Sequence, residues 1–403
     1  MIVDMVTPHS PEEMSDELKA KLKESIRYLK SFTPPQPDKY WLAFSGGKDS
    51  IVLKKVADLA GVDYEAHYSV TSVDPPELMR YIRKFHPDVI WDHPKDKNGK
   101  PMTMWTLIAE HTLPPTRMVR YCCSALKESA GKGRVTLTGV RWAESANRAA
   151  VHGVVDFNNK PVRTRVMAEQ LEAEFELNKN GSVILNNDND SSRRMVEQCY
   201  RTRKTLINPI VKWTERDIWD FIFAYGLPYC ELYDEGFTRL GCIGCPLSGR
   251  KNMERDFKRW PRYKELYIRA FEKMIENHPG QIKILDPEYA AKYPLEAKED
   301  EREINHILLT GGGYTAVGTK SAPSVSQVDA ARSEIGTQDG SFPSISETVM
   351  TNNSSGGVSG ERLRRNGCSG TWADGCRDEY EWKRCSDKPM RIFLYWLDIG
   401  RYQ

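Results

Sequence analysis

The most constraining feature of the sequence is a six-residue segment, Ser45–Ser50, that joins a short apolar run to a helical pattern. Residues 41–44 have the composition of a buried strand, and apolar residues at helical spacing occupy 50–59. Two glycines in Ser-Gly-Gly-Lys-Asp-Ser let the backbone approach a ligand closely and adopt unusual φ values. Together with helix-start N–H groups, the Lys48 amine and serine hydroxyls, they predict a phosphate-binding loop. The segment is not a Walker A loop, because the spacing G-x-x-x-x-G-K-[ST] is absent. The alternative to a phosphate-binding loop is a plain turn between strand and helix, with Lys48 and Asp49 in solvent.

Strand and helix patterns alternate along residues 38–150. Strands are expected at 64–70, 89–91 and 135–139, and a second helix at 76–85. This alternation predicts an α/β fold with a parallel twisted sheet and helices on both of its faces. Ligands of such sheets bind beyond the carboxyl ends of the strands, which is where the glycine-containing segment lies.

Composition divides the 403 residues into three predicted regions. Residues 1–37 are an N-terminal helical segment that ends in prolines, and residues 38–283 form the sheet-containing domain. Residues 284–403 are a C-terminal extension, partly linker-like, because 311–360 is dominated by small residues without periodicity. Within the domain, 178–192 is rich in Asn, Asp and Ser and is predicted to be a surface loop.

Further elements are expected in the second half of the domain. A strand is predicted at 206–210, and a helix at 215–225 with Thr214 as its N-cap. A basic helix is predicted over 257–275, where Pro261 kinks or restarts it. The aromatic residues near the C-terminus indicate a small ordered tail.

Charge, hydropathy and cysteine content bound the class of protein. Lys and Arg number 58 against 56 Asp and Glu, so no global basic field indicates a nucleic-acid partner. No run of about 18 apolar residues predicts a membrane helix, and the N-terminus lacks the pattern of a secretory signal. Nine cysteines in such a chain indicate metal ligands or reactive thiols in a reducing compartment, so we expect a cytoplasmic location.

Two groups of cysteines are the second motif. Cys122 and Cys123 are adjacent, and Cys242 and Cys245 form a C-x-x-C pair that follows Cys230. A C-x-x-C pair offers two thiolates to one metal centre, and the tandem pair can supply the rest if the fold brings it near. Four thiolates suit a [4Fe–4S] cluster or zinc. In the alternative interpretation the tandem pair is buried and the C-x-x-C pair is a redox dithiol.

Two arginines follow the strand expected at 135–139. Arg141 and Arg148 lie beyond its carboxyl end, where guanidinium groups can fork onto phosphate or sulfate oxygens. Glu144 is placed to hold Arg148 at i+4. The alternative is a helix start with ordinary surface ion pairs.

These segments carry a resemblance to known families. The Ser45–Ser50 segment resembles the pyrophosphatase loop of the ATP pyrophosphatase (PP-loop) superfamily. Residues 122–127, Cys-Cys-Ser-Ala-Leu-Lys, resemble the Cys-Cys-x-x-x-Lys segment of the phosphoadenosine phosphosulfate (PAPS) reductase family, and 139–148 its Gly-x-Arg-x-x-x-Ser-x-x-Arg segment. The chain is also similar to the iron–sulfur adenylating subunits of bacterial DNA phosphorothioation systems.

Two further stretches match the family pattern. Residues 208–210 resemble its Asn-Pro-[Ile/Leu] segment and 213–219 its Trp-Thr-x-x-Asp-[Val/Ile]-Trp segment. We assign the second a structural role, with Trp213 and Trp219 in the core. The resemblance covers about residues 38–265 and implies an adenine nucleotide alpha hydrolase-like fold with a cysteine metal-binding subregion.

The resemblance implies two alternative sets of metal ligands. By analogy with the iron–sulfur reductases, the ligands are Cys122, Cys123, Cys242 and Cys245. By analogy with the phosphorothioation subunits, which match Arg-Tyr-Cys at 120–122, they are Cys122, Cys230, Cys242 and Cys245. We favour the second set, because Cys230 lies in the stretch that leads into the C-x-x-C pair.

The resemblance further implies an enzyme that binds ATP and Mg²⁺. We expect it to adenylate an acceptor with release of pyrophosphate, in sulfur transfer. Lys48, Asp49 and Arg141 are the expected catalytic residues, and Asp49 is the expected direct or water-mediated Mg²⁺ ligand. The expected nucleotide-binding residues are Ser45, Gly46, Gly47, Lys48, Asp49, Ser50, Gly139, Arg141, Ser145 and Arg148.

The C-terminal region departs from the sulfonucleotide reductases. Those enzymes attack sulfur with a cysteine in a Glu-Cys-Gly-[Leu/Ile]-His segment, whereas Cys368, Cys376 and Cys385 here lie in another context and no His follows them. We therefore prefer adenylyl transfer and keep reduction of PAPS or adenylyl sulfate as the alternative. A second alternative is a non-catalytic nucleotide-binding module of a nucleic-acid-linked complex.

The expected partners are an adenine nucleotide, a sulfur donor protein and a nucleic acid. A basic stretch interleaved with Trp260 and Tyr263 can contact a nucleic-acid backbone, or be a solvated helix face. We also expect a homo-oligomer or a subunit of a complex. The basic residues are Arg250, Lys251, Arg255, Lys258, Arg259, Arg262 and Lys264.

Overall fold

The structure is a computed structural model that describes residues 10–158, 161–199, 204–285 and 387–399, all within one compact unit. In these residues one sheet contains β1 (Tyr40–Ala43), β2 (Tyr64–Ser69), β3 (Ile90–Asp92), β4 (Val135–Leu137), β5 (Val155–Asn158), β6 (Glu176–Leu177), β7 (Val183–Leu185) and β8 (Lys204–Ile207).

The sheet is mostly parallel. Its order is β3-β2-β1-β4-β8-β5-β7-β6, and the pairs from β3 to β8 are parallel. From β8 onward the pairs are antiparallel. The predicted α/β class is therefore confirmed, but the sheet has an antiparallel edge that we do not expect from the sequence.

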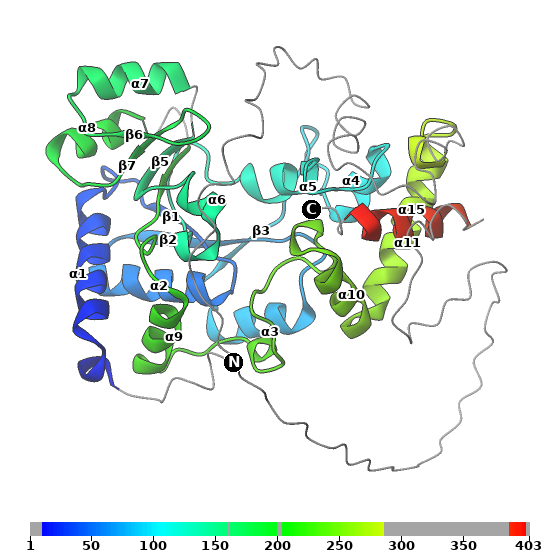
Figure 1. Cartoon of the computed structure of the whole chain (residues 1–403), viewed down its shortest axis with the longest axis horizontal. Helices are drawn as coiled ribbons and strands as arrows, with labels where there is room; N and C mark the ends of the chain where they lie inside the picture. Colours follow the sequence, from blue (N-terminus) through cyan, green and yellow to red (C-terminus); the bar gives the residue numbers. More distant parts are fainter. Residues whose placement is uncertain (1–9, 159–160, 200–203, 286–386, 400–403) are drawn as a thin grey trace, which may run out of the picture. The chain divides into compact units, whose positions relative to one another are not determined.

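Helices flank this sheet (Figure 1). The longer ones are α1 (Asp16–Ser31), α2 (Lys48–Ala60), α3 (Pro76–Phe85), α4 (Met104–Glu110), α7 (Pro161–Gln170), α8 (Asp190–Cys199), α9 (Glu215–Ala224), α10 (Arg250–Arg259), α11 (Pro261–Asn277) and α15 (Lys388–Ile399). The short ones are η2 (Pro11–Glu13), α5 (Tyr121–Cys123), the π-helix η3 (Ser124–Glu128), η4 (Trp142–Glu144), α6 (Ala146–Ala149), η5 (Glu231–Tyr233), η6 (Pro246–Ser248) and η7 (Lys283–Leu285). Among the described residues, no helix combines the length and the apolar character needed to span a bilayer.

The predicted helices agree closely with the structure. α2 and α3 lie where the periodicity places them, and Pro261 begins α11 one residue after the C-cap of α10, so it restarts the helix. α1 packs on α2, which packs on α9, and Lys21 Nζ of α1 lies 2.8 Å from Asp217 Oδ2 of α9. The N-terminal helix is therefore part of the sheet-containing unit.

The antiparallel edge lies partly in the predicted surface loop. Residues 178–192 contain β7 and the start of α8, and all three residues of β7 are buried. The apolar run Val183-Ile184-Leu185 has only three residues and is flanked by polar ones, so it cannot show the alternation that identifies a strand in a sequence. This segment becomes a strand by pairing with β5, and that pairing is visible only in the tertiary structure.

The C-terminal helix α15 packs on α10 and α11 (Figure 1). Phe393 and Trp396 are fully buried, and Trp396 Nε1 donates a hydrogen bond to the Pro115 carbonyl at 2.6 Å. The predicted ordered tail is thus confirmed for this helix. The linker-like stretch 311–360, together with Cys368, Cys376 and Cys385, lies outside the described residues.

Candidate functional site

The predicted phosphate-binding loop lies between β1 and α2, at the carboxyl end of a central strand. Gly46 has φ +72°, and a Cβ on it would lie 2.7 Å from Ile82 Cδ1, so this position requires glycine. Ser45 Oγ accepts a hydrogen bond from the Gly47 N–H at 3.3 Å, and Ser50 Oγ donates one to the Gly47 carbonyl at 2.8 Å. Side chains of the loop thus hold its backbone in place at the start of α2.

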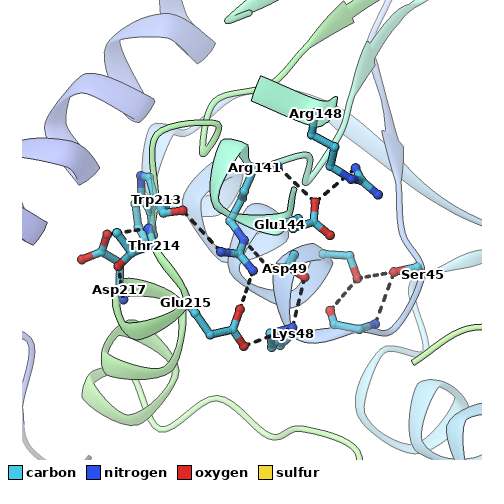
Figure 2. A network of polar contacts seen from close by, with 12 residues as sticks. Ser45, Lys48, Asp49, Arg141, Glu144, Arg148, Trp213, Thr214, Glu215 and Asp217 are labelled. Carbon is cyan, nitrogen blue, oxygen red and sulfur yellow. Dashed lines mark hydrogen bonds and ion pairs between the residues drawn. The ribbon is translucent and has the colours of Figure 1, made fainter. Parts of the chain in front are cut away.

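Four charged side chains form a closed ring beside this loop (Figure 2). Lys48 Nζ lies 3.6 Å from Asp49 Oδ2 and 3.4 Å from Glu215 Oε1. The Arg141 guanidinium completes the ring, donating to Asp49 Oδ1 at 2.6 Å and to Glu215 Oε2 at 2.7 Å. A further nitrogen of Arg141 donates to the Trp213 carbonyl at 3.3 Å. Because cations and carboxylates alternate, each charge has two neighbours of opposite sign.

The ring changes the roles expected of Lys48 and Arg141. Their side chains are only 5% and 1% exposed. Burial lowers the pKa of Arg141, but the charges of Asp49 and Glu215 outweigh it and hold this pKa above its ordinary value. From the sequence we expect Arg141 to present its donors to a ligand. In the structure these donors contact the two carboxylates and a backbone carbonyl. In this arrangement Arg141 positions Asp49.

Glu215 is a site residue that sequence reasoning misses. It is the first residue of α9, whose N-cap Thr214 accepts a hydrogen bond from the Asp217 N–H at 3.1 Å. Trp213 and Trp219 are buried, which confirms the structural role assigned to this stretch. The sequence shows only that Glu215 starts a helix soon after β8, and the order of the strands, with β4 next to β8, places its carboxylate near the end of β4.

Residues after α9 contact the loop from a distant part of the sequence. The Tyr233 hydroxyl accepts a hydrogen bond from the Lys48 N–H at 2.9 Å, and its ring centroid lies 5.6 Å from Lys48 Nζ. Lys48 Nζ also donates to the Thr238 carbonyl at 3.1 Å. Burial raises the pKa of Tyr233, so its hydroxyl remains protonated. No sequence motif marks either residue.

The segment after β4 is only partly as expected. A Cβ on Gly139 would lie 3.2 Å from the backbone of Asp49, so glycine allows this close approach. Ser145 Oγ accepts a hydrogen bond from the Arg148 N–H at 3.2 Å and caps α6 instead of facing a ligand. The Arg148 guanidinium pairs with Glu144 at 3.1 Å, the expected i+4 contact (Figure 2).

One cavity of about 580 Å³ joins the phosphate loop to the cysteines. This volume is within the range of small-molecule binding sites. Its wall includes, from the two motifs, Ser45, Gly47, Asp49, Ser50, Cys123, Cys242 and Cys245. The other charged residues of the wall are Arg120, Lys127, Arg148, Arg239, Arg255, Glu144 and Asp256. Positive side chains outnumber negative ones, so the cavity favours an anionic ligand.

The tandem pair and the C-x-x-C pair lie close enough for their thiols to influence one another. A hydrogen bond with Cys123 raises the pKa of Cys122, as do burial and the charges of Cys242 and Cys245. The same bond lowers the pKa of Cys123 to about 6, and two nearby cations act in the same direction. Lys127 belongs to this cluster, because the charge of Cys242 raises its pKa.

Cys230 has different surroundings. It is fully buried, and burial raises its pKa to about 11. The charges that add most to this shift belong to Glu231, Glu77 and Glu235. The thiols whose charges act on one another are thus those of the reductase-like set, whereas we favour the set with Cys230 from the sequence, and both ligand sets stay predictions. Among the described residues, no three His, Cys, Asp or Glu side chains are arranged to hold a metal ion.

Aromatic packing supports the C-x-x-C loop. Gly244 has φ +69°, and a Cβ on it would collide with the Phe257 ring. Asp256 Oδ2 accepts a hydrogen bond from the Gly244 N–H at 3.1 Å, and burial raises the pKa of this carboxyl to about 6. Phe257 in turn packs on Trp396 with ring centroids 6.0 Å apart. The helix α15 thus lies behind the cysteine loop.

The basic stretch predicted to contact nucleic acid is largely engaged within the chain. Arg259 donates to Glu235 at 2.9 Å and to Glu77 at 3.2 Å. Trp260 is buried and its Nε1 donates to Glu77, while the Tyr263 hydroxyl donates to a backbone carbonyl. Both aromatic residues are therefore used in packing, and a nucleic-acid contact here stays a prediction.

The fold and the cavity define an α/β domain with a glycine-containing loop at the strand ends and cysteines in the wall of the same cavity. The chain belongs to the phosphoadenosine phosphosulfate reductase domain family, whose model matches residues 39–248, just over half of the chain. This family comprises enzymes of the sulfonucleotide and PP-loop type.

The chain is also similar to individual proteins. An uncharacterised protein of Methanocaldococcus jannaschii is 26% identical over 273 residues, which are 65% of this chain and 53% of that protein. A second uncharacterised protein of this organism is 20% identical over 268 residues, 64% and 46% of the two chains. An adenosine 5′-phosphosulfate reductase of Salinibacter ruber is 41% identical over 39 residues, 10% of this chain and 16% of that enzyme. The chain thus spans about half the length of the first two relatives.

Proposed function

We propose that this protein is a PP-loop enzyme that binds ATP and adenylates an acceptor with release of pyrophosphate, in a sulfur-transfer reaction. The observation that carries the proposal is that the loop at Ser45–Ser50 and the charge ring lie side by side at one cavity. The turn at Ser45–Ser50 leads into the N-terminus of α2 and lines a largely basic cavity, and the ring beside it orients Asp49 toward that cavity.

In the proposed reaction the triphosphate of ATP binds to the loop. An oxygen of the acceptor forms a bond to the α-phosphorus, and the bond from that phosphorus to the bridging oxygen breaks. Pyrophosphate leaves with this electron pair. The positive end of α2, which begins at Lys48, stabilises its charge. Arg141 and Lys48 act by holding Asp49 in place.

Asp49 is the carboxylate that would hold Mg²⁺. It lies in the cavity wall beside the loop, and its carboxylate is 21% exposed. Carboxylates combined with phosphate oxygens are the ligands that Mg²⁺ prefers. Bound Mg²⁺ would neutralise phosphate charge.

The four grouped cysteines, Cys122, Cys123, Cys242 and Cys245, would hold a [4Fe–4S] cluster or zinc. The thiol chemistry of this donor set supports the proposal, and the charges of Cys242 and Cys245 act on Cys122, whereas the described side chains are not themselves arranged around a metal position. We derive no step of the reaction from this group.

Reduction of an adenylyl sulfate is the second candidate. The short matches to adenosine 5′-phosphosulfate reductases favour it, as does the grouping of the tandem pair with the C-x-x-C pair. It requires a cysteine that attacks sulfur and a thiol reductant to release sulfite.

Binding and turnover distinguish these candidates. We expect ATP to bind at least tenfold more tightly than AMP, because the loop contacts the two outer phosphates. Asp49→Asn should reduce this preference, whereas Asp63→Asn, an exposed control, should not. Labelled pyrophosphate should exchange into ATP when a cell extract supplies the acceptor. Equal binding of ATP and AMP would contradict the proposal, and sulfite release from adenosine 5′-phosphosulfate with thioredoxin would favour the reductase.

A further inference from the structure

Arg239 is a cavity residue to which neither the sequence motifs nor the proposed reaction assigns a role. It directly follows Thr238, whose carbonyl accepts a hydrogen bond from Lys48 Nζ at 3.1 Å. This contact fixes the backbone beside Arg239 relative to the phosphate loop. The side chain is exposed and lines the cavity that the loop and the cysteines share.

A second guanidinium lies in the same cavity. Arg148 is 25% exposed and pairs with Glu144 at 3.1 Å. Burial lowers the pKa of Arg148, and the positive charges of Arg239 and Arg141 lower it further. Arg148 and Arg239 are therefore near enough to repel each other, although they come from distant parts of the chain.

This pair differs from the cations of the charge ring. Arg141 uses its donors on Asp49 and Glu215, whereas Arg239 has no carboxylate partner in the part of the chain that the structure describes. Arg148 has one carboxylate for its charge. Two like charges in one partly enclosed space raise the free energy of the free protein, and an anion between them lowers it.

We propose that Arg148 and Arg239 form an oxyanion subsite, separate from the loop at Ser45–Ser50, for a phosphate or sulfate group. Guanidinium forks match the oxygen geometry of both groups. The proposal rests on the proposed function in that a nucleotide occupies the same cavity. The group can come from the nucleotide's own phosphates or from a second, anionic substrate.

Isothermal titration calorimetry on the full chain at constant ionic strength tests this subsite and separates the two sources. One arm measures ATP affinity, and the other measures inorganic sulfate affinity in protein already saturated with ATP. The variants are Arg239→Ala and Arg148→Ala, with circular dichroism as the check of folding. Arg163→Ala is the matched control, because it removes an exposed arginine of α7 that does not line the cavity.

If the subsite holds a nucleotide phosphate, Arg239→Ala weakens ATP binding roughly tenfold relative to Arg163→Ala. If it holds a second substrate, ATP affinity is unchanged and the variant loses sulfate binding to the ATP-saturated protein by a similar factor. Either result supports the subsite. The proposal is overturned if Arg239→Ala and Arg163→Ala behave alike in both arms. Failure of the proposed function would show separately, as equal binding of ATP and AMP by the unaltered protein.

Discussion

Glu215 accepts a hydrogen bond from the Arg141 guanidinium at 2.7 Å. This contact ties the first turn of α9 to the segment after β4, next to the loop at the end of β1. Three parts of the chain thereby meet at one charge ring, in which the buried cations Lys48 and Arg141 are each paired with two carboxylates. The ring is the element of the site most open to test.

Glu215→Gln keeps the size of this side chain and removes its charge. Because Arg141 is buried, it then faces only one carboxylate, and we expect the free energy of unfolding to fall by about 1–3 kcal/mol. Urea denaturation measures the change. The exposed Glu265→Gln is the control and should shift stability by less than about 0.5 kcal/mol. Equal effects of the two variants would show that the ring does not stabilise the fold.

Gly46→Ala tests the packing of the phosphate loop. Its φ of +72° costs an alanine about 1–2 kcal/mol, and the collision with Ile82 adds about 1–3 kcal/mol of overpacking. Gly61→Ala is a matched control, because it has φ +66° with nothing within 4 Å of the added Cβ. The difference in thermal stability isolates the contact with Ile82. Equal losses would mean that backbone strain alone requires glycine here.

The cysteine grouping predicts which thiols retain a metal. We expect Cys123→Ser and Cys242→Ser to lose bound metal, while Cys230→Ala keeps it, because the charges that act on Cys230 are those of glutamates, whereas the other four thiols act on one another. Anaerobic purification with iron and zinc analysis and a visible spectrum measures this. Metal loss in Cys230→Ala with retention in Cys123→Ser would instead support the ligand set that contains Cys230. A colourless, zinc-loaded protein would exclude the iron–sulfur cluster.

His86 predicts a pH dependence of stability. The Tyr81 hydroxyl donates to the Pro228 carbonyl at 2.8 Å and lies 2.8 Å from His86 Nε2, so we assign the ring proton to Nε2. Burial, and next Lys54, lower the pKa of His86 to about 4 from its ordinary 6.5. Between these values the unfolded chain binds a proton that the folded chain does not. Stability should therefore rise by up to about 3 kcal/mol from pH 4 to pH 6.5.

The variant His86→Gln separates this residue from the other titrating groups. Unfolding free energies measured by urea at several pH values should show a flatter slope in this variant. The exposed His93→Gln should keep the slope of the unaltered protein. A slope unchanged by His86→Gln would assign the pH dependence to other residues.

Local pattern predicted much of the fold. The period of apolar residues places α2 and α3, Thr214 caps α9, and Pro261 separates α10 from α11, because propensity and capping act within a few residues. The strand β7 escaped prediction, because three apolar residues carry no period and become a strand only by pairing with β5 and β6. The site shows the same limit. The loop is recognisable as a contiguous motif, whereas only the tertiary structure places Tyr233 at the loop and Arg239 in the cavity wall.

The sequence by itself determined the α/β class, the position of the glycine loop and the two cysteine motifs, since each depends on residues that are neighbours along the chain. Only the tertiary structure decided that Glu215 closes the charge ring, that Arg141 is buried in that ring, and that the charges of the C-x-x-C pair act on the tandem pair. The physical reason is that charge compensation depends on distance in space. Buried charges take whichever partners the packing of distant segments brings within a few ångströms.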